Sequence, residues 1–555
     1  MSNINPLKRL YQVLKLEKRE ISSIYFYSIF NGLMQLSVPL GVQAIIGFVL
    51  GSEMITSIYI LISLVVLGVL FVGVFQIKLM QTIEKIQQRI FARYAFEFSV
   101  KVPEIGLKNI DKVYLPELVN RFFETQNVQK GLSKLLLDVP ISSIQIVFGL
   151  LLLTLYNPLF IILGFILLII TIVMIYLTSA EGFKTSLKES FYKYELVAWL
   201  QEMGRVVKSF KFGLVNNLNL RKTDDILVDF LQSRTAHFKI LLLQYKVLVV
   251  FKVFITAIML GFGTYLLVIQ ELNIGEFIAT EIVILTIIGA VEKLISSLDS
   301  VYDVLTGIDK MAVVTDNLIE EKGTLMVKSG GIGIELIDLS FDYGGGKNVL
   351  NDLNFNIPPN SSVCIYGSEG SGKSTLINIL AGAYKEFSGN LLYNNIPFNN
   401  YDIDFLRSKI GFYGNQDDIF KGTILENINL GNPAITPEKI LDLATQLGIE
   451  NFLISLSMGF DTKTMAMGRF LPSNTVKKIL LLRGLVTEPQ LILLEEPLMG
   501  LDDLAKEKMC NYLFSKERNA TIIISSNEAH IIKKCDYKIK IINGKAIMTK
   551  NITNG

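Results

Sequence analysis

Six long apolar segments in the first part of the chain constrain the fold more than any other feature. They cover residues 21–50, 55–80, 132–155, 159–178, 247–270 and 276–298. Each is long enough for a helix to cross a hydrocarbon layer of about 30 Å, and a helix is the only open-chain structure that satisfies its own backbone in lipid. We therefore expect an all-α transmembrane six-helix domain over residues 21–310.

The connections between these segments predict the orientation of the chain. The short connections 51–54, 156–158 and 271–275 carry no Lys or Arg, whereas the long ones, 81–131 and 179–246, are rich in both. The positive-inside rule then places the long connections and both termini in the cytoplasm of a multi-pass inner-membrane protein.

The long connections have helical periodicity, so they are expected to extend the spans into the cytoplasm. Their tips, near 106–116 and 209–220, are candidate contacts with a distant domain, and solvated helical hairpins are the alternative. Residues 1–20 are basic and amphipathic, which predicts a cytoplasmic interfacial helix.

Ionisable residues inside the spans are functional candidates. Glu281 could face a substrate cavity, or it could lie near the outer headgroups with Glu276. Lys252 lies close enough to the cytoplasmic end of its span to snorkel, so we assign it no role.

A polar, glycine-containing linker is expected at residues 311–332, and beyond it strand-like and helical runs alternate over 333–555. This alternation predicts an α/β domain. The net charge of +2 favours neither nucleic acid nor an acidic partner. Three cysteines, Cys364, Cys510 and Cys535, lack the spacing of metal ligands and are interpreted as reduced cytosolic thiols.

The second domain contains the strongest motif of the chain, Gly-Ser-Glu-Gly-Ser-Gly-Lys-Ser at residues 367–374. It follows a predicted strand at 362–366 and precedes a helical run at 375–383, the context that a phosphate-binding P-loop requires. Its backbone amides and the helix N-terminus would hold phosphate, Lys373 would reach the β- and γ-phosphates, and the Ser374 hydroxyl would ligate Mg²⁺. A chance glycine loop is the alternative.

A second acidic element, Leu-Ile-Leu-Leu-Glu-Glu-Pro, lies at residues 491–497. An apolar strand that ends in two carboxylates can deliver Glu495 to the metal and Glu496 to an attacking water. A surface pair of glutamates is the alternative, but such a pair seldom follows four large apolar residues.

Residues 335–546 resemble the ATPase domain of ABC transporters, and the six spans resemble the exporter type. The resemblance implies a P-loop NTPase fold, ATP and Mg²⁺ as cofactors, and a second half-transporter as partner within the lipid bilayer. Residues 37–46, 263–268 and 274–279 resemble hemolysin- and bacteriocin-type secretion exporters, which would add a periplasmic adaptor protein as a further partner.

The resemblance also implies a role for individual residues. Tyr343 matches the aromatic residue that stacks on adenine, Glu495 the Walker B carboxylate, Glu496 the catalytic glutamate and residues 498–502 the D-loop. The nucleotide-binding residues are then Tyr343, Gly367, Ser368, Glu369, Gly370, Ser371, Gly372, Lys373, Ser374 and Thr375. The metal ligands are Ser374, Asn415 and Glu495, and the catalytic residues are Glu496 and Asn527.

The chain departs from the family at the signature segment, where Leu-Ser-Gly-Gly-Gln is replaced. In the family this segment binds the γ-phosphate on the opposite subunit. Pro472 removes an N–H, and Asn474 adds a side chain where glycine allows close approach. The replacement residues are Leu471, Pro472, Ser473, Asn474 and Thr475.

Three further positions depart from the family. The Q-loop glutamine aligns with Asn415, one residue before Gln416, and the switch histidine aligns with Asn527, or with Ser526 after a one-residue slip. His530 is expected to point elsewhere. Asn527 cannot become cationic, which weakens the clamp on the γ-phosphate. Glu495 stands where Asp is usual.

Two functional hypotheses remain open from the sequence. One is an ATP-driven exporter subunit that moves a polypeptide or, as a second choice, a lipid or lipophilic compound. The other is a catalytically impaired ATP-binding subunit of a heterodimeric exporter. Because a homodimer would place the altered signature in both ATP sites, we favour a heterodimer, although symmetry alone favours a homodimer.

Overall fold

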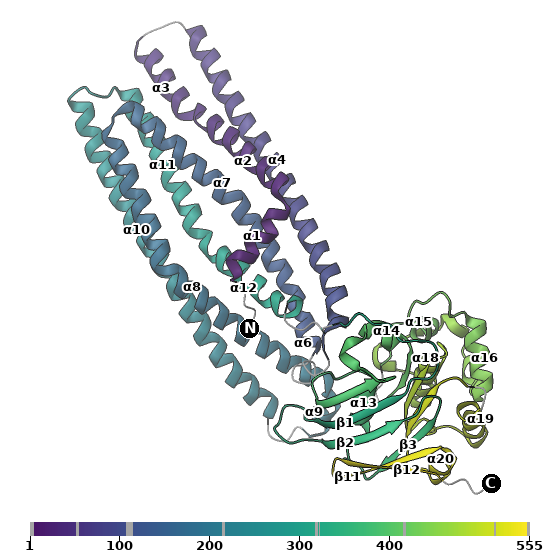
Figure 1. The fold of residues 1–555 in the computed structure, drawn as a ribbon. Coiled ribbons are helices and arrows are strands. Elements are labelled where there is room, and N and C mark those ends of the chain that lie inside the picture. Colours follow the sequence, from purple (N-terminus) through teal and green to yellow (C-terminus); the bar gives the residue numbers. More distant parts are fainter. Residues whose placement is uncertain are drawn as a thin grey trace. The chain divides into compact units, whose positions relative to one another are not determined.

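The computed structural model describes residues 5–51, 55–106, 115–213, 217–316, 320, 322–414, 418–515 and 518–551 (Figure 1). The chain divides into two compact units, Met1–Ile105 with Val113–Ile319, and Gly106–Lys112 with Glu320–Gly555. The first is called the helical unit below and the second the α/β unit. The expected contact tip at 106–116 lies largely outside the described residues, as does part of the tip at 209–220.

Within its described residues, the helical unit contains six helical segments that are long and apolar enough to cross a membrane, which confirms the predicted six-helix region. Several of them continue far beyond their apolar part, as the long ribbons of α8 and α10 show (Figure 1). Its helices are α1 (Pro6–Leu16), α2 (Lys18–Gln35), α3 (Ser37–Leu50), α4 (Ile55–Lys101), α6 (Leu115–Asn120), α7 (Glu124–Tyr156), α8 (Leu159–Arg205), α9 (Val207–Gly213), α10 (Leu218–Val268), α11 (Ile274–Ser296) and α12 (Leu298–Thr315).

The first apolar segment is not one helix, as the sequence suggested, but two. Helix α2 ends at Gln35 and α3 begins at Ser37, so the segment is interrupted at Leu36. Pro39 supplies the physical reason, because its ring nitrogen cannot donate to the carbonyl of residue 35 and its ring crowds the preceding turn. At the other end of the unit, α12 continues to Thr315, so the expected linker at 311–332 begins as helix.

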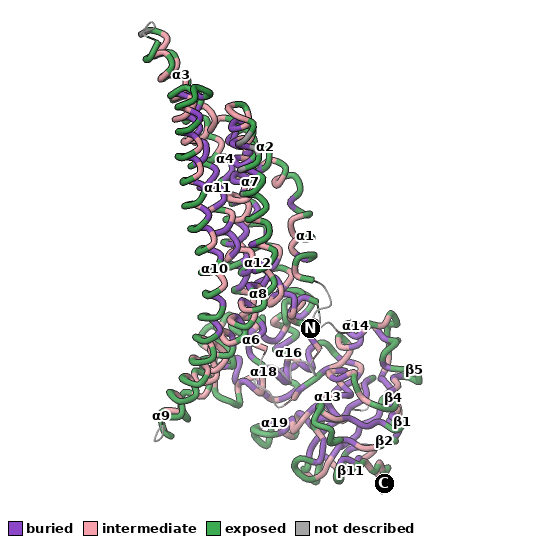
Figure 2. The backbone as a smooth tube through the Cα atoms, turned by 90° about the vertical axis from the view of Figure 1, so that its left-hand side faces the viewer, coloured by how far each residue is buried: buried purple, intermediate pink, exposed green. Residues whose placement is uncertain are grey.

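Helices α7 and α11 form the buried part of the helical unit. Half of the most apolar window of α11–α12 is buried, against 6% of the corresponding window of α4. Figure 2 shows buried, intermediate and exposed residues alternating along the long helices. We expect the exposed apolar side chains of α4 to face lipid. Many apolar side chains of α7 and α11 are instead buried within the protein.

Ion pairs hold the first helix against the rest of the unit. Arg9 of α1 pairs with Asp316 after α12. Glu17, between α1 and α2, is 2% exposed and accepts hydrogen bonds from Arg89 at 3.1 Å and Arg93 at 2.6 Å, both on α4. A carboxylate this deeply buried is stable as an anion only when it is paired, and here two guanidinium groups pair with it.

The structure shows the partners of several ionisable residues in the spans. Lys252 does not merely snorkel, because it forms an ion pair with Glu292 of α11. The sequence could not show this pair, since the two residues lie on different helices. Glu276 and Asn273 form a capping box at the start of α11. One buried carboxylate oxygen of Glu281 has no hydrogen-bond partner among the described residues.

The α/β unit contains a four-stranded antiparallel sheet in the order β2-β1-β4-β5 and a six-stranded sheet in the order β12-β11-β3-β10-β9-β6. Within the larger sheet, β11, β3, β10, β9 and β6 are parallel, and β12 is antiparallel to β11. The strands are β1 (Ile334–Phe341), β2 (Leu350–Ile357), β3 (Ser362–Gly367), β4 (Ser388–Tyr393), β5 (Ile396–Pro397), β6 (Ile410–Tyr413), β7 (Gly422–Thr423), β8 (Lys463–Thr464), β9 (Leu491–Glu495), β10 (Thr521–Ser525), β11 (Tyr537–Ile542) and β12 (Lys545–Lys550).

The helices of the α/β unit cover the larger sheet, and they confirm the predicted α/β class. They are α13 (Lys373–Leu380), α14 (Ile403–Ser408), α15 (Ile424–Asn429), α16 (Pro437–Leu447), α17 (Asn451–Ile454), α18 (Ser473–Leu485), α19 (Asp503–Leu513) and α20 (Ala529–Lys534).

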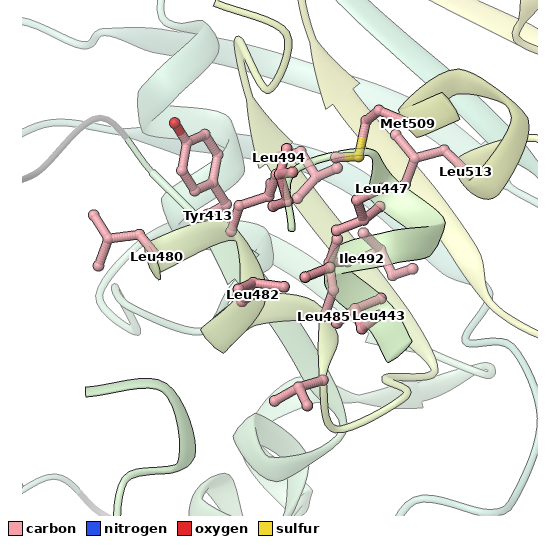
Figure 3. Packing of buried hydrophobic residues seen from close by; sticks show 14 of the residues in the cluster. Tyr413, Leu443, Leu447, Leu480, Leu482, Leu485, Ile492, Leu494, Met509 and Leu513 are labelled. Atoms are coloured by element: carbon pink, nitrogen blue, oxygen red, sulfur yellow. The ribbon is translucent and has the colours of Figure 1, made fainter. Parts of the chain in front are cut away.

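Strand β9 is buried on both faces, as a continuous apolar run in a parallel sheet predicts. Its side chains alternate between two hydrophobic cores. Ile492 and Leu494 pack in one with α16, α18 and α19 (Figure 3), and Leu491 and Leu493 pack in the other. This packing on both sides fixes the strand that ends at Glu495.

Candidate nucleotide-binding site

Three parallel strands end at one edge of the larger sheet, and their ends carry the predicted site residues. Ser525, at the end of β10, is in register with Ile365 of β3 and with Glu495 of β9. The residues that follow these strands are therefore neighbours. Ligand sites of parallel α/β sheets lie at this carboxyl edge.

The loop between β3 and α13 has the geometry of a phosphate-binding loop. Gly367 has a φ of 155° and Gly372 a φ of 104°, and a Cβ on Gly367 would lie 2.4 Å from the carbonyl oxygen of Ile541. The loop thus requires glycine for its conformation and for its packing. Helix α13 begins at Lys373 directly after it, so the amides of the first helical turn point into the loop.

Lys373 and the metal-ligand candidates lie at this loop. The Nζ of Lys373 donates to the carbonyl oxygens of Gly367 and Ser368, each at 2.9 Å, so the ammonium group lies inside the loop. The hydroxyl of Ser374 donates to the carboxylate of Glu495. A hydroxyl and a carboxylate in contact are the oxygen donors that suit Mg²⁺. The third predicted ligand, Asn415, lies outside the described residues.

Glu496 is held by the end of β10. Its amide donates to the Ser525 carbonyl at 2.9 Å, and its carboxylate accepts from the Ser526 hydroxyl at 3.1 Å. Glu496 has a φ of 45°, an uncommon conformation for a residue other than glycine. The carboxylate is therefore oriented by Ser526.

Both candidates for the switch position reach the site. The side-chain oxygen of Asn527 accepts from the Gly367 amide at 3.1 Å, while Ser526 contacts Glu496. His530 points elsewhere, as expected, because its ring nitrogens face Glu528 at 3.4 Å and the Cys510 sulfur at 3.9 Å.

Tyr343 lies beside the loop at the start of α13. Its hydroxyl is 2.9 Å from the Thr375 hydroxyl, and its ring packs edge-on against Phe341 and Tyr384. Tyr343 is 40% exposed, so it keeps surface available for a further aromatic contact.

The altered signature segment forms the start of α18. Helix α18 begins at Ser473, and Pro472 is its N-cap residue without a side-chain hydrogen bond. The Pro472 carbonyl accepts from the amides of Thr475 at 2.8 Å and Val476 at 3.2 Å. A Cβ on Gly500 would lie 2.7 Å from the side-chain oxygen of Asn474, so Asn474 lies directly against the segment 498–502.

Sequence reasoning missed a cleft of about 580 Å³ next to Ser374 and Glu495. Arg407 and Arg483 line it. The guanidinium of Arg483 donates to the main-chain oxygens of Asn427 and Asp418 at 2.6 and 2.9 Å, and burial lowers the pKa of Arg483. The sequence did contain a signal for Arg483, because an arginine within the apolar run of α18 needs a hydrogen-bond partner when it is buried.

The sequence of the α/β unit matches a known family. Residues 350–499 match the family described as ABC transporter. This range contains the P-loop, the altered signature, both glutamates and the first two residues of the segment 498–502.

Curated relatives resemble a larger part of the chain. An uncharacterised ABC transporter ATP-binding protein of Bacillus subtilis is 25% identical over 304 residues, 53% of this chain and 50% of the relative. The alpha-hemolysin translocation protein HlyB of Escherichia coli O157:H7 is 26% identical over 52% of this chain and 41% of its own length. The pediocin PA-1 transport/processing protein PedD of Pediococcus acidilactici is 24% identical over 59% and 46%. The chain thus spans about half the length of the curated relatives that it matches.

A solved structure resembles nearly the whole chain. A bacterial Atm1-family ABC exporter with ATP bound superimposes with a TM-score of 0.82 at 16% sequence identity, over 96% of this chain and 95% of its own. At this identity the likeness establishes the fold. The chain therefore carries an ABC transporter domain, joined to a six-helix region in the fold of an ABC exporter.

Proposed function

We propose that the chain is an ATP-driven exporter subunit that binds MgATP at the carboxyl edge of its larger sheet. The observation that carries this proposal is the meeting of Lys373, Glu495 and Glu496 at one edge, from elements far apart in the sequence. A P-loop lysine next to a hydroxyl–carboxylate pair and a second, separately oriented carboxylate is what phosphoryl transfer to water requires.

Each residue has a distinct part in this proposal. Lys373 and the amides of α13 bind the β- and γ-phosphates, Ser374 and Glu495 hold Mg²⁺, and Tyr343 stacks on the base. When bound, Mg²⁺ neutralises charge on the phosphate oxygens. Glu496 orients the attacking water and accepts its proton, and Ser526 keeps the Glu496 carboxylate in place.

We further propose a polypeptide as the exported cargo. HlyB is named for alpha-hemolysin translocation and PedD for pediocin PA-1 transport and processing, and both resemble this chain over more than half of its length. A lipid or lipophilic compound is the second choice, because the six-helix region alone suits either class.

A second candidate function is that of an impaired subunit paired with a different half-transporter. Pro472 and Asn474 favour it. Pro472 replaces the serine whose hydroxyl would contact a phosphate across the dimer, and Asn474 occupies the space beside Gly500. A partner with an intact signature would form one competent site with Lys373 and Glu496 of this chain.

The test is to purify the full chain alone and measure its mass and its rate of phosphate release, with Lys373→Ala as the inactive control. The impaired-subunit account predicts slow release, and faster release after a related half-transporter is added. Fast release by a stable dimer of this chain alone would contradict it, and would show that the altered signature works in both sites.

A further inference from the structure

Uncharged polar side chains lie at the centres of three membrane spans. Gln35 is central in the apolar segment 21–50, Gln145 in 132–155 and Thr286 in 276–298. Polar groups at this depth are shielded from bulk water, so each requires a partner from the protein, a ligand or an enclosed water. The sequence treats the three spans independently, but the structure brings these residues together.

They line a cavity of about 200 Å³ between α2–α3, α7 and α11, which we call the midspan cavity. Apart from these three residues its walls are apolar, and none of the described residues that line it carries a charge. Gly149 of α7 permits the close approach of α11, because a Cβ there would lie 2.8 Å from a side-chain carbon of Ile287. The space suits one residue of a chain with a few waters, since a water occupies about 30 Å³.

The break between α2 and α3 forms one wall of the midspan cavity. Gln35, Leu36 and Pro39 all line it. Because Pro39 has no N–H, the main-chain carbonyl of Gln35 lacks its helical donor. Irregular backbone at membrane depth is tolerated where it is buried in protein or lines a cavity. The residue whose carbonyl lacks its helical donor, Gln35, therefore lies in this wall.

The two glutamines form a half-satisfied pair. Gln145 donates from Nε2 to Oε1 of Gln35 at 2.5 Å. Among the described residues, no further bond engages the Nε2 group of Gln35, a donor, or the Oε1 atom of Gln145, an acceptor. The pair therefore still presents uncharged N–H donors and an amide oxygen, which can pair with the C=O and the N–H of a peptide group.

We propose that the midspan cavity binds a backbone peptide group of an extended polypeptide during its export. The proposal rests on the proposed polypeptide cargo and names the site that accepts it. Because the contacts are to the main chain, they do not select a particular sequence. The apolar walls restrict the bound segment to small or apolar side chains. A lipid acyl chain would leave the Nε2 group of Gln35 and the Oε1 atom of Gln145 without a partner, because it offers neither a donor nor an acceptor.

The test uses the full chain in phosphatidylcholine nanodiscs and a fluorescent, N-acetylated and C-amidated peptide of alanine, leucine and serine as probe. The double variant Gln35→Leu with Gln145→Leu removes both amides together. Replacing both partners of a hydrogen bond by apolar groups is nearly neutral for folding. The matched control is Gln43→Leu, which removes an amide from α3 whose partner is the Tyr156 hydroxyl at 2.6 Å and which lies outside the cavity lining.

We expect the double variant to bind the probe about 25-fold more weakly, roughly fivefold for each of two hydrogen bonds, and Gln43→Leu to bind it like the parent. A probe with N-methylated backbone amides should bind the parent weakly and lose nothing further in the double variant. Equal binding of the probe by parent and double variant, or of both probes by the parent, would overturn the proposal.

The same samples separate this proposal from the proposed ATPase function. If MgATP binds to the parent while the probe does not, the midspan cavity is not a peptide site and the nucleotide site stands. If MgATP does not bind, the proposed ATP-driven function fails whatever the probe does.

Discussion

Restoring the signature segment should activate the chain. The change is Pro472→Ser, Ser473→Gly, Asn474→Gly and Thr475→Gln. In the structure, Pro472 caps α18 without a side-chain hydrogen bond, and Asn474 lies against Gly500. The new serine hydroxyl can donate to a phosphate of the opposite subunit, and a hydrogen bond to a charged group contributes about 1.5–3 kcal/mol.

If this bond is made in the transition state, phosphate release should rise roughly ten- to a hundredfold, since each 1.36 kcal/mol is tenfold in rate. The two added glycines weaken the first turn of α18 by about 1 kcal/mol each, which lowers stability but not the chemical step. The assay is phosphate release by the full chain in nanodiscs, with the dimer verified by mass. The single variant Asn474→Gly measures how much of the increase in phosphate release comes from removing the side chain beside Gly500.

A verified dimer whose release is unchanged by all four substitutions would refute the reasoning. It would mean that the altered signature does not limit turnover and that another departure, such as Asn527, does.

Three further outcomes follow from the site and its core. Tyr343→Ala should weaken ATP binding by about 1–3 kcal/mol if the ring stacks on the base, measured by titration with a fluorescent ATP analogue, and an unchanged affinity would make it a packing residue only. Ser526→Ala should lower phosphate release with little change in ATP affinity, because it frees the Glu496 carboxylate that it now orients; an equal loss of both would contradict a positioning role. Leu494→Ala should lower the free energy of unfolding of the α/β unit by about 2–5 kcal/mol, because Leu494 is fully buried. Denaturant unfolding followed by circular dichroism measures this change. An unchanged midpoint would mean that the packing of β9 is unimportant.

The sequence predicted those features that a local pattern encodes. The spans follow from apolar length, and the P-loop follows from glycines placed between a strand and a helix. The neighbourhood of Glu495, Glu496 and Asn527 depends on strand order, and the β3-β10-β9 order is set by long-range pairing that no local pattern contains.

Pairings between distant helices were also beyond the sequence. Lys252 and Glu292, or Gln35 and Gln145, meet because of how the helices pack, and apolar periodicity does not specify that packing. The break at Leu36 is different, because Pro39 in the apolar segment was a usable signal. The cleft beside Arg483 required the three-dimensional position of α18 against the sheet.

The central claim is that the carboxyl edge of the larger sheet binds MgATP through Lys373. Equilibrium binding of MgATP to the full chain in nanodiscs, compared with Lys373→Ala, tests it most directly. We predict one nucleotide bound per chain and its loss in the variant, because the phosphates lose the ammonium group that lies inside the loop. Equal binding by the parent and the variant, or no binding by the parent, would contradict it.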